Sequence, residues 1–280
     1  MIQDPMPSKD HLKTLILFST FSNQIDLSMT AGSHQVSLDH TNFDVFNYTK
    51  DLLNNDLDGV CDYIAQLSYL TTKTCHLVID NCGLEFFSDL CFGLYLLTTS
   101  SANEVVFHIK VLLFCVRKFP TFVSDVTSAD ITYMSSFLYD SNDPDLIKVQ
   151  DLMSEYVESG KIIFRPNLSW NFSHHYSDLL TAWSQFSEIH ESFKESSLVV
   201  FKGDLNYRRL CGELNWDIDT PMSVMLQNFK NFPLLILRTV KSVSICGIES
   251  DMVDRVKNLD ENWYINGEKG QIIFINHKLD

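Results

Sequence analysis

Short apolar runs that end in polar residues and give way to helical segments recur along this chain. The clearest example is His76-Leu77-Val78-Ile79, which stops at Asp80-Asn81-Cys82-Gly83 and continues into helical spacing over residues 84–98. An unbroken apolar run of this length is typical of a strand that is buried on both faces, as in parallel sheets. Because a strand followed by a loop and a helix is the basic unit of α/β folds, the pattern predicts that class.

The same alternation predicts the other elements. Strands are expected at residues 104–108, 161–164, 198–201, 234–237 and 242–248, with a terminal hairpin over 263–275 around Asn266-Gly267. Helices are expected at residues 10–22, 56–70, from Asp125 to about 139, 145–158, near 178–186, directly after Asp204, and at 251–258. Polar loops are expected at residues 29–45 and 166–178. Since no linker-like stretch divides the chain, residues 1–280 are predicted to form one α/β/α domain.

The charge balance limits the ligands that such a domain can take. The net charge is −15, while apolar residues make up 45% of the chain and charged residues 20%. A chain this acidic repels the phosphate backbone, which argues against general nucleic-acid binding. An anionic substrate such as a phosphate ester would need local compensation, either from a metal ion or from clustered Arg and Lys side chains.

The short apolar runs and the spacing of the cysteines predict a cytoplasmic protein with no membrane segment. Residues 1–10 lack the apolar core of a signal peptide, and the longest apolar run, residues 111–116, is too short to span a bilayer. No cysteine pair has CxxC spacing, so reduced and mostly buried thiols are expected. The seven cysteines are Cys61, Cys75, Cys82, Cys91, Cys115, Cys211 and Cys246.

Polar residues collect at three predicted strand ends, which are Asp80-Asn81, Asp125 and the segment from Asp204 to Arg208. Ligands of open α/β sheets bind outside the carboxyl ends of the strands. Carboxylate and amide oxygens are hard ligands that suit Mg²⁺ or Mn²⁺, and two carboxylates with one amide leave coordination positions open for water and a phosphate oxygen. From spacing alone, an Asp after a strand is also explained as a helix N-cap, so both interpretations stay open.

Longer motifs around these positions resemble those of the damage-control phosphatase family, which was long catalogued as a domain of unknown function. Residues 80–90 (DNCGLEFFSDL) resemble its metal motif, and residues 107–130, with Phe107-His108-x-Lys110 and a later Val-Ser-Asp, resemble its second metal segment. Residues 201–210 (FKGDLNYRRL) resemble its substrate loop, and residues 23–28 resemble the entry to its catalytic domain. Residues 238–241 match the Arg-Thr-x-Lys signature of the sugar-phosphate subgroup, also called acidic residue methyltransferase-like.

This resemblance implies an α/β/α sandwich around a mostly parallel sheet, and a metal-dependent phosphomonoesterase that acts on small sugar phosphates such as fructose 1-phosphate. It assigns catalysis and metal binding to Asp80, Asn81 and Asp125. The implied metal is Mn²⁺ or Ni²⁺, with Co²⁺ and Mg²⁺ as further options. Substrate-binding positions are implied at Asp80, Asn81, Asp204, Leu205, Asn206, Tyr207, Arg208 and Lys241.

A second activity is also described for the subgroup, the methylation of protein carboxylates with S-adenosylmethionine. Glu85 matches a position assigned to that cofactor, together with Asp125. The chain has no glycine-rich loop of the GxGxxG type, so this activity ranks second.

Two departures from the family pattern raise a third alternative, an inactive or regulatory homologue. Residues 111–117 (VLLFCVR) are interpreted as an insertion just before Asp125, where it would displace a metal ligand or bulge from a loop. Family members also usually carry a helical segment before the region where this sequence begins, and its absence is expected to expose an apolar surface.

Two further motifs are interpreted as structural. Asp56-Leu57-Asp58-Gly59 matches the DxDG signature of haloacid-dehalogenase phosphatases, but that chemistry needs a buried strand directly before the motif, and only Leu52-Leu53 precede Asn54-Asn55. A loop and the start of a helix are therefore expected there. His174-His175 is expected in a solvated loop, because adjacent residues point apart on regular elements.

Overall fold

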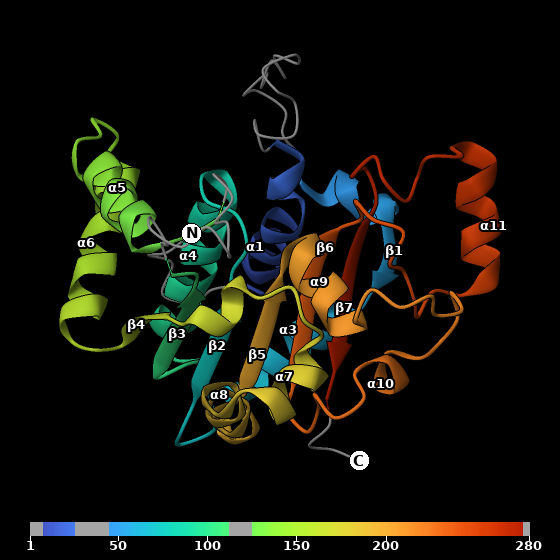
Figure 1. Cartoon of the computed structure of the whole chain (residues 1–280). Helices are drawn as coiled ribbons and strands as arrows, with labels where there is room; N and C mark the ends of the chain where they lie inside the picture. The colour runs from blue at the N-terminus through green and yellow to red at the C-terminus, as the bar shows by residue number, and fades with distance from the viewer. Residues whose placement is uncertain (1–7, 26–44, 112–124, 277–280) are drawn as a thin grey trace.

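The computed structural model, drawn in Figure 1, describes residues 8–25, 45–111 and 125–276, and a single sheet runs through its centre. The seven strands are β1 Leu52–Asn55, β2 Thr74–Val78, β3 Glu104–Ile109, β4 Ile162–Pro166, β5 Leu198–Lys202, β6 Leu234–Thr239 and β7 Gly270–Ile275. Their spatial order is β1-β7-β6-β5-β2-β3-β4. Strands β2 to β6 are parallel to one another, whereas β7 pairs antiparallel with β6 and β1 lies parallel to β7. The predicted α/β fold with a mostly parallel sheet is confirmed.

Helices cover both faces of this sheet, because alternate strand residues point to opposite sides. On β5, Val200 packs in one apolar cluster with α1, α3 and α4, while Val199 and Phe201 pack in another with α7 and α8. In Figure 1 the helices α7, α8 and α9 lie on the near face. The α-helices are α1 Lys9–Phe21, α3 Leu57–Leu67, α4 Leu84–Thr98, α5 Ser128–Tyr139, α6 Pro144–Glu158, α7 Tyr176–Ala182, α8 Ser184–Glu195, α9 Gly203–Cys211, α10 Met222–Met225 and α11 Ser250–Leu259.

The strand order places a switch point between β2 and β5. From β2 the chain moves outward through β3 to β4, and it then returns to lay β5 on the other side of β2. Loops leaving two strands at such a point diverge to opposite faces and leave a crevice at the carboxyl ends. The residues after β2 and the residues after β5 therefore flank the position where α/β proteins bind their ligands.

Two strand predictions near the C-terminus are wrong. Residues 242–248 form no strand, because Ser242 and Ser244 turn inward to polar partners and Gly247 has a φ of 72°. Residues 263–275 form no hairpin: the chain turns over 261–267, and only β7 is extended. Strand β7 finds its partners in β6 and in β1, a short strand that the sequence analysis did not predict.

The DxDG motif leads into a helix, as predicted, but the reason given for that prediction, the lack of a preceding strand, is wrong. Strand β1 does precede Asp56, yet its direction is opposite to that of β2, so Asp56 lies at the other end of the sheet. There its carboxylate accepts a hydrogen bond from the backbone of Phe274 at 2.8 Å, and α3 begins at the next residue.

The histidine pair and one long helix also differ from expectation. His174 is exposed, but His175 is buried and its Nε2 lies 3.0 Å from the carbonyl oxygen of Leu210, so a solvated loop is wrong for His175. The helix expected near 178–186 is instead two helices that meet at Trp183, α7 and α8.

Several predictions fall on residues outside the described ranges. They include most of the 29–45 loop, the proposed insertion after Val111, and the motif residues Asp26, Leu27, Ser28, Pro120 and Ser124. All six cysteines in the described ranges are free thiols, and four of them are buried, as expected. In the described part of the chain, no helix is both long enough and apolar enough to cross a bilayer. The assignment of residues 1–280 to one domain stays a prediction.

Candidate active site

The segments that follow β2 and β3 are joined by backbone contacts at the carboxyl edge of the sheet. Asn81 and Asp125 form an isolated antiparallel bridge, and the Val126 N–H donates to the Asp80 carbonyl at 3.3 Å. The Lys110 N–H in turn donates to the Val126 carbonyl at 3.0 Å. The three residues assigned to metal binding, Asp80, Asn81 and Asp125, are therefore brought together although 44 positions separate the first from the last.

Both carboxylates of this group are nearly enclosed. Asp80 is 4% exposed and Asp125 is 5% exposed, and the Lys110 ammonium forms an ion pair with Asp125 and lies 3.7 Å from Asp80 Oδ1. Burial raises the pKa of Asp80 to about 7; Lys110 opposes this, while Glu85, Asp125 and Asp204 reinforce it. One ammonium shared by two carboxylates leaves negative charge at this edge.

A glycine lets the second element of the site approach Asp80. Helix α9 begins at Gly203, whose φ of 82° favours glycine, and a Cβ there would lie 2.1 Å from Asp80 Oδ2. Any other residue at position 203 would collide with the carboxylate. Gly203 therefore sets how closely the segment after β5 packs against the segment after β2.

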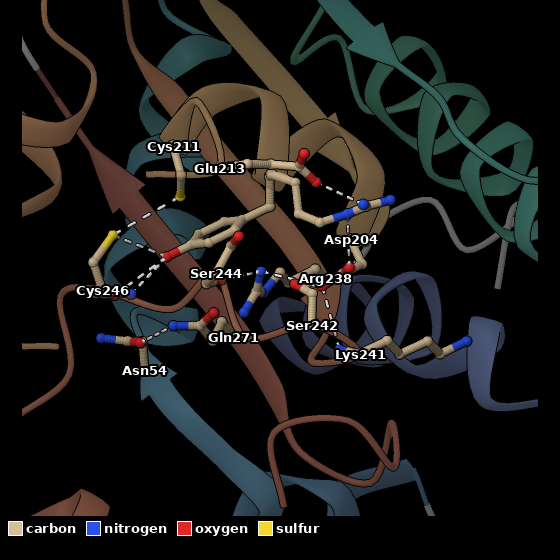
Figure 2. A network of polar contacts seen from close by, with 12 residues as sticks. Asn54, Asp204, Cys211, Glu213, Arg238, Lys241, Ser242, Ser244, Cys246 and Gln271 are labelled. Carbon is tan, nitrogen blue, oxygen red and sulfur yellow. Dashed lines mark hydrogen bonds and ion pairs between the residues drawn. The ribbon is translucent and has the colours of Figure 1, made fainter. Parts of the chain in front are cut away.

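Asp204 collects donors from the segment after β6, as Figure 2 shows. Its Oδ1 lies 3.2 Å from Arg238 Nη1, accepts from the Ser242 hydroxyl at 3.1 Å and accepts from the Lys241 N–H at 3.3 Å. Its Oδ2 lies 3.4 Å from Nε of Arg208, whose Nη1 also donates to Glu213 at 2.7 Å. Asp204 thus joins the side chain of Arg208 to the backbone of Lys241.

Arg238 contacts this cluster from the interior of the protein. Its side chain is fully enclosed, its guanidinium carbon lies 3.5 Å from the centroid of the Tyr207 ring, and its Nη1 donates to the Ser244 carbonyl at 3.2 Å. The Nε and Nη2 atoms of Arg238 have no hydrogen-bond partner among the described residues. Sequence reasoning noted Arg238 only as part of a signature, although a charged residue at the end of an apolar strand is itself a signal.

The predicted substrate-binding residues divide into two groups. Asp204, Arg208 and Lys241 meet at the edge of the sheet. Asn206 and Tyr207 point into the interior: the Asn206 amide donates to the Lys202 carbonyl at 2.8 Å and accepts from the Tyr176 hydroxyl at 2.6 Å, and the Tyr207 hydroxyl lies against Cys246. Leu205 is half-buried.

A buried cluster behind Asn81 fixes the orientation of its amide. Asn81 Nδ2 donates to Glu85 Oε2 at 2.9 Å, while Glu85 Oε1 lies 3.7 Å from the Lys202 ammonium. Lys202 also pairs with Asp89 at 3.1 Å, and the Ser19 hydroxyl donates to the same carboxylate at 2.7 Å. Burial raises the pKa of Asp89 to about 6. Because the amide nitrogen is engaged, the amide oxygen of Asn81 is the atom left to face a cation.

The donor set fits a hard divalent cation. Within residues 8–25, 45–111 and 125–276, no group of three or more His, Cys, Asp and Glu side chains is arranged to hold a metal ion. The implied set instead combines the carboxylates of Asp80 and Asp125 with the amide oxygen of Asn81. These are oxygen ligands of the type that Mg²⁺ and Mn²⁺ take, and among the described residues Asp80 and Asp125 share the ammonium of Lys110.

Comparison with known proteins places this chain in a family. The family model of the damage-control phosphatase ARMT1-like domain matches residues 2–256. The chain is similar to the damage-control phosphatase ARMT1 of Homo sapiens, with 28% identity over 271 residues, 94% of this chain and 58% of the relative. The Bos taurus protein is 28% identical over 275 residues, 95% of this chain and 59% of the relative, and the Danio rerio protein is 24% identical over 271 residues, 95% and 58%. The chain thus spans just under three-fifths of the length of these relatives. It belongs to the damage-control phosphatase ARMT1-like family.

Proposed function

We propose that this chain is a metal-dependent phosphomonoesterase of the cytoplasm that hydrolyses small sugar phosphates such as fructose 1-phosphate. The observation that carries the proposal is the bridge between Asn81 and Asp125, which gathers two buried carboxylates and an amide beside α9. Membership in a family of damage-control phosphatases supports hydrolysis of a phosphate ester.

The two sides of the edge would act on different parts of the reaction. Asp80, Asn81 and Asp125 would hold the cation, with Glu85 orienting the Asn81 amide. Bound there, Mn²⁺, Ni²⁺, Co²⁺ or Mg²⁺ would neutralise phosphoryl oxygens and lower the pKa of a coordinated water. Arg208 and Lys241 would supply positive charge for the phosphate group on a chain whose net charge is −15.

The described contacts of Glu85 do not favour the methyltransferase alternative. Glu85, the residue matched to S-adenosylmethionine binding, is 2% exposed, and both of its carboxylate oxygens face Asn81 or Lys202. These contacts give Glu85 a positioning role toward Asn81 instead. The inactive-homologue alternative rests on residues 111–117, of which only Val111 lies in the described ranges.

Phosphate release from fructose 1-phosphate tests the proposal. Metal-stripped protein should be inactive, and Mn²⁺ should restore a saturable activity that a chelator removes. The matched control is Asp58→Asn, which changes an exposed carboxylate on α3 and should leave the rate unchanged. Activity that is insensitive to chelation would contradict metal dependence. Methyl transfer from labelled S-adenosylmethionine that Glu85→Gln abolishes would support the alternative.

A further inference from the structure

Two buried thiols meet beneath the substrate side of the site. Cys211 is the last residue of α9, and Cys246 lies in the segment that follows β6; neither side chain is exposed. Their Sγ atoms are 3.9 Å apart (Figure 2). This contact joins two segments that carry site residues, since Asp204 and Arg208 lie on α9 and Lys241 lies after β6.

Cys246 has the surroundings of a reactive thiol. The Tyr207 oxygen lies 3.2 Å from its Sγ and accepts a hydrogen bond from the Cys246 N–H at 3.2 Å, while the Arg238 guanidinium stacks on the Tyr207 ring. The hydrogen bond from Cys211 lowers the pKa of Cys246 to about 7; Tyr207 and Arg238 act in the same direction, and burial opposes them. The thiolate is the nucleophilic form of cysteine, so these contacts favour reaction.

Three other cysteines of the described chain, two buried and one partly buried, have the opposite character. Burial raises the pKa of Cys61, Cys75 and Cys91 to about 12 in each case. Those thiols stay protonated at neutral pH and react slowly with electrophilic oxygen. They are internal controls for any chemistry assigned to Cys246.

We propose that Cys246 and Cys211 form a peroxide-sensitive thiol pair that closes to an intramolecular disulfide. The Cys246 thiolate attacks one oxygen of a hydroperoxide, the O–O bond breaks, and the other oxygen leaves as hydroxide or alkoxide and takes up a proton. The product is a sulfenic acid at Cys246. The Cys211 sulfur then attacks the Cys246 sulfur, and water leaves with the Cys211 proton. The peroxide is reduced by two electrons and the two thiols are oxidised to the disulfide.

Closing the disulfide would disturb the substrate side of the site. The two sulfur atoms must approach from 3.9 Å to about 2.05 Å. The approach draws the end of α9 toward the segment after β6 and removes the thiol beside the Tyr207 hydroxyl. The Tyr207 ring stacks against the guanidinium of Arg238, and Arg238 forms an ion pair with Asp204. We therefore expect oxidation to lower phosphate release by roughly tenfold or more. This expectation rests on the proposed function, whereas formation of the disulfide does not.

The test is peptide mass mapping of the folded chain after a short treatment with hydrogen peroxide. We expect a cross-link between the peptides of Cys211 and Cys246, with the loss of two hydrogens, to form at least about tenfold faster than oxidation of Cys61 or Cys75. Cys91→Ala should leave the link intact. In Cys211→Ala a dione reagent for sulfenic acids should label Cys246, and in Cys246→Ala it should label neither position.

Three results would overturn the proposal. They are the absence of the link in protein that circular dichroism shows to be folded, oxidation of all cysteines at equal rates, and failure of the dione to label Cys246 in folded Cys211→Ala. In oxidised wild-type protein, a thiol reductant should restore phosphate release together with the free thiols. Unchanged phosphate release in fully linked protein would overturn the coupling to the site, while the mass data would still establish the pair.

Discussion

At the carboxyl edge of the sheet, the side formed after β2 and β3 and the side formed after β5 and β6 differ in the balance of their charged side chains. On the β2–β3 side, Asp80 and Asp125 share the ammonium of Lys110, and burial with neighbouring carboxylates raises the pKa of Asp80 to about 7. On the β5–β6 side, the carboxylate of Asp204 lies against Arg208, Arg238 and the Lys241 N–H, and the exposed Glu213 also pairs with Arg208. The first side therefore favours a cation and the second an anion, which is the pairing that a metal-dependent phosphatase needs.

Removing one carboxylate from the cation side should have the largest effect. Asp80→Asn keeps the shape of the side chain but removes a charged ligand, so we expect phosphate release, at the Mn²⁺ concentration that saturates wild type, to fall by about a thousandfold, or about 4 kcal/mol. The metal-free variant should be no less stable than wild type, because the burial cost of the charge and its repulsion with neighbouring carboxylates outweigh its attraction to Lys110. Denaturant unfolding measures that second effect, and a strongly destabilised variant would contradict the charge argument.

Removing the ammonium should act in the reverse direction on stability. In Lys110→Met, Asp80 and Asp125 lose the ammonium that contacts both of them, so the metal-free protein should lose about 3 kcal/mol of unfolding free energy. Mn²⁺ should recover part of that loss in urea unfolding. Lys148→Met, which removes an exposed lysine on α6, is the control. An effect no larger than that of the control would mean that the carboxylates need no cation.

His76 should disfavour the folded state in acid. His76 Nδ1 lies 2.9 Å from His108 Nε2, both rings are buried, and burial lowers the pKa of His76 to about 3 from its usual 6.5. The unfolded chain therefore binds a proton below pH 6.5 that the folded chain does not bind, so the contribution of His76 to stability falls as pH drops from 6.5 toward 3. This contribution should fall by about 2 kcal/mol by about pH 5, whereas the raised pKa values of Asp80 and Asp89 favour the folded chain in acid. The difference in unfolding free energy between wild type and His76→Phe isolates the histidine: it should shift against wild type by about 2 kcal/mol between about pH 7 and about pH 5, and a constant difference would contradict the assignment.

The smallest effect is expected from the anion side. Arg208 is about one-third exposed, so Arg208→Gln should raise KM for fructose 1-phosphate by about tenfold with little change in kcat. Arg255→Gln on α11 is the matched control and should leave both constants unchanged. A fall in kcat without a rise in KM would move Arg208 from substrate binding to the chemical step.

Part of the site could be predicted from the sequence, because the ends of buried strands have a recognisable pattern. Apolar runs that stop at Asp80 and just before Asp204 mark the ends of buried strands, and parallel strands bring such ends to one edge. Asp125 was also expected after a strand, but residues 112–124 lie outside the described ranges, and the structure places Asp125 by its bridge to Asn81. The motif resemblance then named Asn81, Arg208 and Lys241. The cations that complete the clusters, Lys110, Lys202 and Arg238, were missed as site residues, because their partners come from other segments of the chain and such pairing is not visible in a linear sequence.

Other parts depend on tertiary packing that local patterns do not encode. Strand β1 has only four residues and ends in Asn54-Asn55, yet it forms because β7 offers it a partner. Residues 242–248 alternate like a strand, but Ser242 and Ser244 are drawn to Asp204 and Arg238 instead. Neighbouring residues on α9 face different directions, so the substrate loop sends Asn206 and Tyr207 inward and Arg208 outward.

Direct titration of Mn²⁺ into metal-free protein, followed by electron paramagnetic resonance or calorimetry, tests the central claim most closely. We expect one tight Mn²⁺ site in the wild-type protein and in Asp58→Asn, and the loss of that site in Asp80→Asn and Asp125→Asn. Retention of the same affinity in both of the latter variants would contradict the account, because the cation would then be held elsewhere.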